Sequence, residues 1–274
     1  MSETADTWLR NTTSLWIPSS SQFVGARGHR AAIETRLNTD LGLHGMFEIG
    51  SLRHGTGIRR YSDADYLVSL KGSRPISPWT TLNKVKESLQ ARFQFTTIEV
   101  RQPAVVCRFS DGDVEVVPGF YTDGGYSIPN PTGGWMLTHP TDHNAWVNEV
   151  NKKFDGAAKK LARQVKVWKY RRSVPVSSCY LEMRAAQHID GEKTYSPVWD
   201  LYLALSKMQT AQLAAMNDPT GLGSRFTATS SESSRADALS KLSTATARAL
   251  KAKNYAAAGD EENAIAQLKL LLNV

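Results

Sequence analysis

The chain has 274 residues, of which 41% are hydrophobic and 22% are charged, proportions typical of a globular protein with a large buried core. Its apolar runs are too short to span a bilayer, and residues 1–6 lack the basic and apolar regions of a secretory signal, so we expect no integral membrane protein. The net charge of +7 favours anionic partners, and two cysteines, Cys107 and Cys179, both expected to be buried, fit a reducing cytoplasm.

Strands and helices alternate in the pattern as far as residue 140. Apolar residues at helical spacing predict helices over residues 22–41, with Ser20 or Ser21 as N-cap, and 80–92. Runs rich in β-branched and aromatic residues predict five strands. These strands cover residues 46–50, 65–70, 93–101, 104–110 and 114–117. Residues 119–140, rich in glycine, proline, asparagine and threonine, are expected to be irregular.

After residue 140 the pattern becomes helical. Apolar residues from Trp146 to Trp168 recur every three or four positions, which predicts one long amphipathic helix with Gly156 as a candidate kink. Further helices are expected over residues 180–189, 197–213, 236–257 and 260–272. We therefore predict two domains: an α/β lobe over residues 1–140 and a helical lobe over residues 141–274, which the long helix joins.

The segment from Gly50 to Val68 carries the clearest chemical signal. Asp63 and Asp65 open a predicted strand one residue apart, so their side chains share one face and converge. Two such carboxylates repel each other unless a cation lies between them, and Mg²⁺ is the hard, oxygen-seeking ion that also binds phosphates. The Gly50–Ser51 turn just upstream can direct N–H and hydroxyl groups at those phosphates. Either motif alone is common on ordinary loops and turns; together they predict a site for a metal-bound nucleoside triphosphate.

Two-metal phosphoryl chemistry needs a third acid from a neighbouring strand. Asp113 and Glu115 are the candidates in the segment Asp113-Val114-Glu115-Val116-Val117-Pro118. Because they are two residues apart, both lie on the same face of the predicted strand. The alternation of the strand therefore does not choose between them.

The sequence from Gly50 to Val68 resembles the signature of the polymerase β-like nucleotidyltransferases. It is most similar to the branch that contains cGAS, oligoadenylate synthases and bacterial CD-NTases. The resemblance implies an α/β (α+β) nucleotidyltransferase lobe with a mixed sheet, a C-terminal helical lobe, and an active site in the cleft between them. In this family the third acid precedes a hydrophobic pair and a proline, which indicates Glu115, with Asp113 as the fallback. Most relatives have Asp at this position.

The resemblance extends into the helical part. It implies that Lys166, in Leu161-Ala162-Arg163-Gln164-Val165-Lys166-Val167-Trp168, and Ser178, in Ser178-Cys179-Tyr180-Leu181-Glu182, bind the triphosphate with Gly50 and Ser51. Lys166 as a solvated helix lysine and Ser178 as a helix N-cap are the structural alternatives. Trp135 is either a surface-loop anchor or a platform for base stacking.

The function implied by the resemblance is a cytoplasmic enzyme that joins nucleoside triphosphates into a cyclic di- or trinucleotide second messenger in bacterial antiphage defence. Asp63, Asp65 and Glu115 would ligate two Mg²⁺ ions, with Mn²⁺ as an alternative. The product would activate an effector protein, and a nucleic-acid activator is a further candidate partner. The competing hypotheses are nucleotidyl transfer to a tRNA, protein or small molecule, and an inactive nucleotide or RNA sensor. The bases, the linkage and the ring size stay open.

Overall fold

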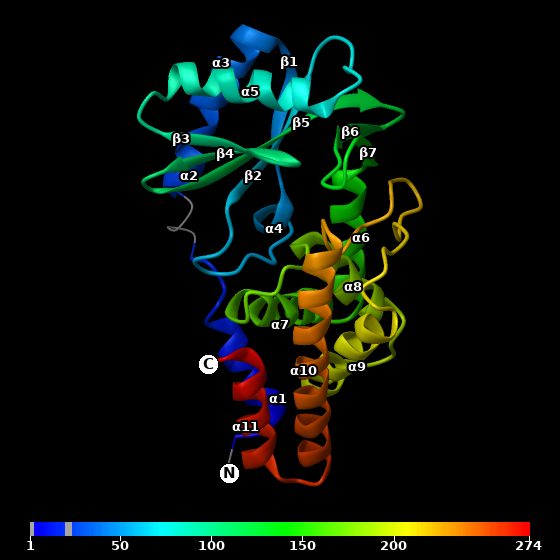
Figure 1. Ribbon diagram of the computed structural model, residues 1–274. Coiled ribbons are helices and arrows are strands. Elements are labelled where there is room, and N and C mark those ends of the chain that lie inside the picture. The colour runs from blue at the N-terminus through cyan, green and yellow to red at the C-terminus, as the bar shows by residue number, and fades with distance from the viewer. Residues whose placement is uncertain (1–2, 20–23) are drawn as a thin grey trace.

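The computed structural model describes residues 3–19 and 24–274 and has a sheet with its covering helices at one end and a bundle of helices at the other (Figure 1). The suggested N-caps Ser20 and Ser21 lie outside the described residues. The predicted combination of a mixed α/β part and a helical part is confirmed.

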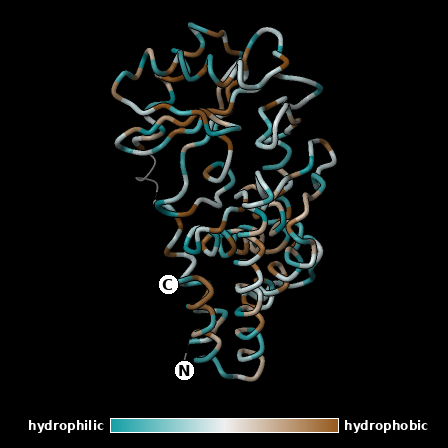
Figure 2. Tube along the Cα trace, in the orientation of Figure 1, coloured by the Kyte–Doolittle hydropathy of each residue, from teal (hydrophilic) through white to brown (hydrophobic). Residues whose placement is uncertain are grey.

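The centre of the molecule's sheet is formed by β2 (Ala64–Leu70), β5 (Gly112–Thr122) and β4 (Ala104–Phe109). The outer strands are β1 (Leu43–Ile49) and β3 (Thr97–Arg101), in the order β1-β2-β5-β4-β3. Only β2 and β5 are parallel among these neighbours, so the sheet is mixed. The central position of β2 explains why every residue of this strand except Asp65 is buried. Figure 2 shows hydrophobic colour in the strands of the sheet.

Three helices cover one face of this sheet: α2 (Val24–Gly28), α3 (Arg30–Leu41) and α5 (Pro78–Arg92) (Figure 1). Their apolar residues pack with the strands in one core cluster, which includes Ile33, Leu82, Val105 and Val116. The single helix predicted over residues 22–41 is therefore wrong in one respect, because the chain is interrupted at His29 between α2 and α3.

The expectation of an irregular segment over residues 119–140 is wrong. Strand β5 continues to Thr122, and β6 (Gly125–Pro129) and β7 (Trp135–Thr138) form a hairpin beside it. Gly124, Gly133 and Gly134 lie in the turns and have positive φ, whereas Gly119 and Gly125 lie within strands. Composition averaged over the segment hid two short strands between these turns.

The rest of the chain is helical and consists of α6 (Pro140–Lys153), α7 (Ala157–Arg171), α8 (Ser178–Asp190), α9 (Pro197–Thr210), α10 (Glu232–Ala257) and α11 (Glu261–Leu272). The long helix predicted through Gly156 is two helices. Asp155 and Gly156 both have positive φ, which a continuous α-helix does not allow, so the chain breaks there rather than kinks.

A helix that the sequence pattern did not predict, α1 (Ala5–Ser14), packs on α7, α9 and α11. Thr4 caps its first turn, and the Ala5 N–H donates to Glu261 Oε2 at 2.6 Å. The beginning and the end of the chain therefore lie side by side (Figure 1). The division at residue 140 stays a prediction, with α1 packing on the helical side.

Neither cysteine forms a disulfide. Cys107 is buried as predicted, but Cys179 is exposed, so the expectation that both are buried is wrong for Cys179. It lies in the first turn of α8, where exposure depends on what packs above the helix end rather than on the local sequence. Within residues 3–19 and 24–274, no helix combines the length and the apolar character needed to cross a membrane.

Candidate active site

The predicted acids meet at one end of the two parallel strands. Asp63 directly precedes β2, and Asp65 is the second residue of that strand. In the parallel register Asp65 lies opposite Glu115 of β5. Adjacent strands are about 4.8 Å apart, so the sheet itself brings these carboxylates to neighbouring positions. Figure 1 shows this end of β2 next to α4 (Gly50–Arg53), on the side toward the helices.

The acids disfavour one another's ionised form. Burial, and then the charges of Glu115 and Asp113, raise the pKa of Asp63 to about 6. The pKa of Asp65 is raised well above its ordinary value by burial and by the charges of Glu115 and Asp63. Burial also raises the pKa of Glu115, against the opposing charge of Arg101. A cluster of oxygen donors whose charges need a counter-charge is the set that a hard divalent cation prefers. The residue types fit such an ion, although the oxygens of the three carboxylates do not all lie within 4.8 Å of one another.

Glu115 and Asp113 differ in their surroundings. Asp113 faces Arg108 of β4, with 2.6 Å between Oδ2 and Nη1. Glu115 Oε1 lies 2.8 Å from Arg101 Nη2, yet among residues 3–19 and 24–274 that buried oxygen accepts no well-aligned hydrogen bond. Among the acids, Glu115 is also the strongest electrostatic neighbour of both Asp63 and Asp65. The environment of Glu115 therefore supports its assignment as the third acid.

The Gly-Ser motif lies against Asp65. It does not form the predicted tight turn: Gly50 and Ser51 open the helical turn α4, after β1 ends at Ile49. Gly50 has a φ of +69°, and a Cβ built there would collide with the Asp65 carboxylate. The Ser51 backbone opposes the rise in the pKa of Asp65, and Ser51 Oγ donates to Ser62 Oγ at 3.1 Å. Glycine is thus required both by the backbone and by the carboxylate beside it.

Lys166 of α7 is fully buried, so the alternative of a solvated helix lysine is wrong. Its Nζ donates to Thr56 Oγ1 at 3.1 Å and lies 3.2 Å from Glu182 Oε2 of α8. Glu182 also accepts a hydrogen bond from Thr56 at 2.5 Å and pairs with His54. Although burial would raise it, the charge of Lys166 and the hydrogen bond with His54 lower the pKa of Glu182 to about 2. Glu182 therefore stays ionised and joins residues 54–56 to both helices.

Ser178 is the first residue of α8, and the N-cap is its neighbour Ser177, whose side chain accepts from the Tyr180 N–H. The N-cap alternative for Ser178 is therefore wrong. Instead, Lys169 Nζ donates to Ser178 Oγ at 2.6 Å, and Tyr170 OH lies 3.0 Å from the same oxygen. Sequence analysis did not single out Lys169. Its spacing of three from Lys166 on one helix was the available signal.

Trp135 acts as an anchor for a loop. Its Nε1 donates to the carbonyl of Pro75 at 2.9 Å, the ring meets Phe120 edge to face, and Arg74 lies over it. These contacts tie β7 to the segment between β2 and α5, and they occupy the indole N–H. Of the two alternatives for Trp135, the structure supports the anchor.

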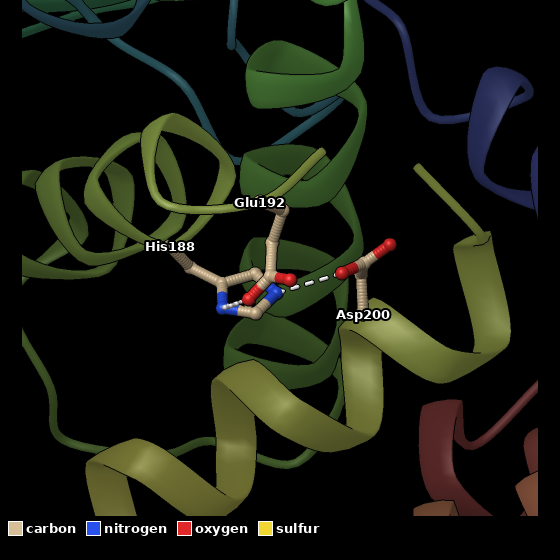
Figure 3. Close-up of side chains that lie close together, drawn as sticks. All are labelled: His188, Glu192 and Asp200. Atoms are coloured by element: carbon tan, nitrogen blue, oxygen red, sulfur yellow. Dashed lines mark hydrogen bonds and ion pairs between the residues drawn. The ribbon is translucent and has the colours of Figure 1, made fainter. Parts of the chain in front are cut away.

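In the described part of the chain, one group of three side chains has its potential ligand atoms within 4.8 Å of one another, namely His188, Glu192 and Asp200 (Figure 3). Asp200 Oδ1 lies 2.8 Å from His188 Nε2, and Lys207 Nζ lies 2.9 Å from His188 Nδ1. Both imidazole nitrogens thus have protein partners, and Lys207 already supplies a positive charge. The three side chains are spaced as in a metal site. Their hydrogen bonds and ion pairs, however, are those of a polar network that joins α8 to α9.

Comparison with known proteins identifies the family. A model of the Second Messenger Oligonucleotide or Dinucleotide Synthetase domain matches residues 12–151, which include all three acids and the Gly-Ser motif. The chain belongs to this family, and the predicted relationship to bacterial CD-NTases is confirmed.

The chain is similar in sequence to cyclic nucleotide synthases and in fold to solved CD-NTase structures. A probable cyclic nucleotide synthase of Bacillus cereus is 33% identical over 131 residues, covering 44% of this chain and 40% of the relative. A cyclic AMP-AMP-AMP synthase of Acinetobacter is 30% identical over 116 residues, covering 41% of this chain and 33% of the relative. The chain thus matches less than half the length of either. The structure of E. coli MS115-1 CdnC with ATP has a TM-score of 0.73 at 16% identity and covers 97% of both chains, so the fold is shared throughout.

Proposed function

We propose that the chain is a metal-dependent nucleotidyltransferase that makes a cyclic di- or trinucleotide from free nucleoside triphosphates. The observation that carries the proposal is the group of Asp63, Asp65 and Glu115 on adjacent strands, next to a Gly-Ser motif, in a member of a second-messenger synthetase family. In each transfer, a sugar hydroxyl of one nucleotide attacks the α-phosphorus of another. A phosphodiester bond forms, the bond to pyrophosphate breaks, and the hydroxyl proton is released.

Asp63, Asp65 and Glu115 would hold Mg²⁺, or Mn²⁺ in its place. Bound there, the ions would lower the pKa of the attacking hydroxyl and neutralise charge on the triphosphate. The residues of the chain position the substrate around that centre. Gly50 lets the backbone approach Asp65, the Ser51 backbone favours the ionised form of that carboxylate, and the Ser178 hydroxyl offers a polar contact for phosphate from the helical side.

The biological setting follows from the same proposal. We place the enzyme in the cytoplasm of a bacterium, in antiphage defence, where its product activates an effector protein. ATP is one candidate substrate, because the E. coli CdnC structure of the same fold contains ATP. Residues 1–140 and 141–274 form the two lobes around the site in this proposal, with α1 attached to the second lobe. A nucleic-acid activator is a further candidate partner in this proposal.

The test is to incubate the protein with all four triphosphates and Mg²⁺ or Mn²⁺, treat the mixture with phosphatase, and analyse it by mass spectrometry. We expect a phosphatase-resistant cyclic oligonucleotide. The reaction is repeated with RNA and with DNA, so that an enzyme that needs an activator is also detected. The variant with both Asp63→Asn and Asp65→Asn should give no product. A purely linear product, or label on a tRNA or protein acceptor, would overturn the cyclic-product proposal in favour of acceptor transfer. No product under any condition would favour a sensor.

A further inference from the structure

We infer that Arg101 competes with the divalent ion for Glu115: it holds this acid away from the aspartates and must release it before all three acids can ligate the ion. The inference rests on the proposed function, because it takes the acid cluster as the place where the ion binds. It goes further by assigning control of ion binding to a residue outside the sequence motifs. It depends on the position of Arg101 in the sheet, on its contacts and on the spacing of the acids.

Arg101 approaches Glu115 from the side of β5 that is opposite to the aspartates. The sheet order β1-β2-β5-β4-β3 places β2 on one side of β5, and β4 followed by β3 on the other. Glu115 lies opposite Asp65 of β2 and opposite Val106 of β4. Val106 in turn lies opposite Glu99 of β3. These four residues form one row on one face of the sheet, and Arg101, two residues after Glu99, shares that face.

The contact between Arg101 and Glu115 draws the acid across the sheet. Neighbouring strands are about 4.8 Å apart, so β3 is about 10 Å from β5 and the two side chains meet over β4. Arg101 Nη2 lies 2.8 Å from Glu115 Oε1, and this oxygen is therefore directed toward β3 rather than toward β2. The spacing of the acids agrees with this, because the oxygens of Asp63, Asp65 and Glu115 do not all lie within 4.8 Å of one another.

The same contact is one that a stronger cation can break. The side chain of Arg101 is 62% exposed and that of Glu115 only 16%, so Arg101 can turn into solvent while Glu115 stays in the site. In the part of the chain that the structure describes, Glu115 Oε1 accepts no well-aligned hydrogen bond, so the attraction to Arg101 lacks a directional component. An ion pair with so exposed a partner is weak. A divalent ion has twice the charge of Arg101 and prefers carboxylate oxygens.

The test is the affinity for Mn²⁺ without nucleotide, measured from the electron paramagnetic resonance signal of the free ion. Arg101→Gln keeps a polar side chain and removes the charge that competes for Glu115. We expect this variant to bind Mn²⁺ about threefold to tenfold more tightly than the wild type, the effect of a partly exposed ion pair that no longer has to be broken. Binding that is lost in the variant with both Asp63→Asn and Asp65→Asn is the binding that belongs to the acids.

Two further variants separate the direct contact from a general effect of charge. Arg108→Gln is the matched control, because Arg108 lies on β4 and pairs with Asp113 and Glu99 instead of Glu115. It should change the affinity for Mn²⁺ by less than about twofold, since solvent and salt screen a charge that does not touch the ligands. Glu115→Asp shortens the acid by one methylene and should take it out of reach of Arg101. In that background, Arg101→Gln should add little affinity.

The Tm provides a second readout. In EDTA, Arg101→Gln should melt below the wild type, because Glu115 loses its paired cation. In saturating Mn²⁺ this deficit should disappear, because the ion binds the variant more tightly and stabilises it by a correspondingly larger amount. An arginine with a purely structural role would leave the same deficit in both conditions.

An unchanged or weaker affinity for Mn²⁺ in Arg101→Gln would overturn the inference. An equal gain in Arg108→Gln, or an undiminished gain from Arg101→Gln in the Glu115→Asp background, would also overturn it. If Arg101→Gln shows the expected gain but the wild type makes no product, only the proposed activity fails. If neither protein binds Mn²⁺ at the acids, the inference fails together with the metal dependence of the proposed enzyme.

Discussion

Replacing Asp63 by asparagine should abolish activity and yet make the ion-free protein more stable. The substitution keeps the shape of the side chain and removes one negative charge from a cluster that includes Asp65 and Glu115. In the proposed enzyme that charge holds a divalent ion, so its loss should reduce product formation by about a hundredfold or more. Without the ion, the same charge only repels its neighbours.

The size of the stability effect follows from the pKa of Asp63, which is raised from 3.8 to about 6. At 1.36 kcal/mol per pKa unit, ionising this carboxylate costs the folded protein at most about 3 kcal/mol. Partial exposure of the side chain reduces this to about 1 to 3 kcal/mol. Because the folded pKa is the higher one, the penalty is absent below the ordinary pKa of 3.8. It grows as the pH rises from 3.8 to about 6 and is complete above pH 7.

The assay is the Tm at pH 7.5, first in EDTA and then with increasing Mg²⁺. One kcal/mol shifts the Tm of a chain of this size by about 2 to 4 °C, so Asp63→Asn should melt several degrees above the wild type in EDTA. Mg²⁺ should then stabilise the wild type by about 2.7 kcal/mol at a hundred times its Kd, and the variant by less. Glu87→Gln, which removes an exposed carboxylate of α5, is the matched control. A lower Tm for Asp63→Asn in EDTA, or an equal response to Mg²⁺, would refute the reasoning.

Two further predictions address the third acid and the buried Glu182. Glu115→Gln should abolish product formation, whereas Asp113→Asn, which loses the pair with Arg108, should keep it. The opposite result in the phosphatase-resistant product assay would move the third acid to Asp113. Because the pKa of Glu182 is lowered to about 2, its stabilisation is complete above its ordinary pKa of 4.5 and is lost as the pH falls from there toward 2. Glu182→Gln should therefore lower the Tm by several degrees at pH 7. The Tm difference between this variant and the wild type should narrow between pH 4.5 and 3. A Tm difference that does not depend on pH would contradict this.

The sequence was most informative where chemistry depends on local spacing. The alternation of side chains placed Asp63 and Asp65 together, and the motif around Glu115 indicated its strand, which the structure pairs directly with β2. The same logic failed for residues 119–140, because an average composition does not separate glycine turns from the short strands between them. Helix α1 was missed because its stability depends on packing against α11, at the other end of the chain.

Contacts between distant segments were also beyond prediction. Helical periodicity placed Lys166 at the border of an apolar stripe, a position that suits either a surface lysine or a buried one. Burial was decided by α8, which brings Glu182 to Lys166. For the same reason Lys169 could not be linked to Ser178, nor Arg101 to Glu115. Each of these pairs exists because two elements pack together, and no spacing along the chain encodes that packing.

The loop between α4 and β2 explains how the two halves of the site are held in register. The acids come from strands, whereas the lysines and Ser178 come from α7 and α8. The segment that joins Gly50 and Ser51 to Asp63 runs between them: Thr56 and His54 bind Glu182 of α8, and Ile58 is fully buried in the core of the helical part. A displacement of α8 would therefore move this segment, and with it both ends of the acid motif. Glu182 bears the charge that draws Lys166, His54 and Thr56 together. Substituting Glu182 should therefore reduce catalysis more than its distance from the acids suggests.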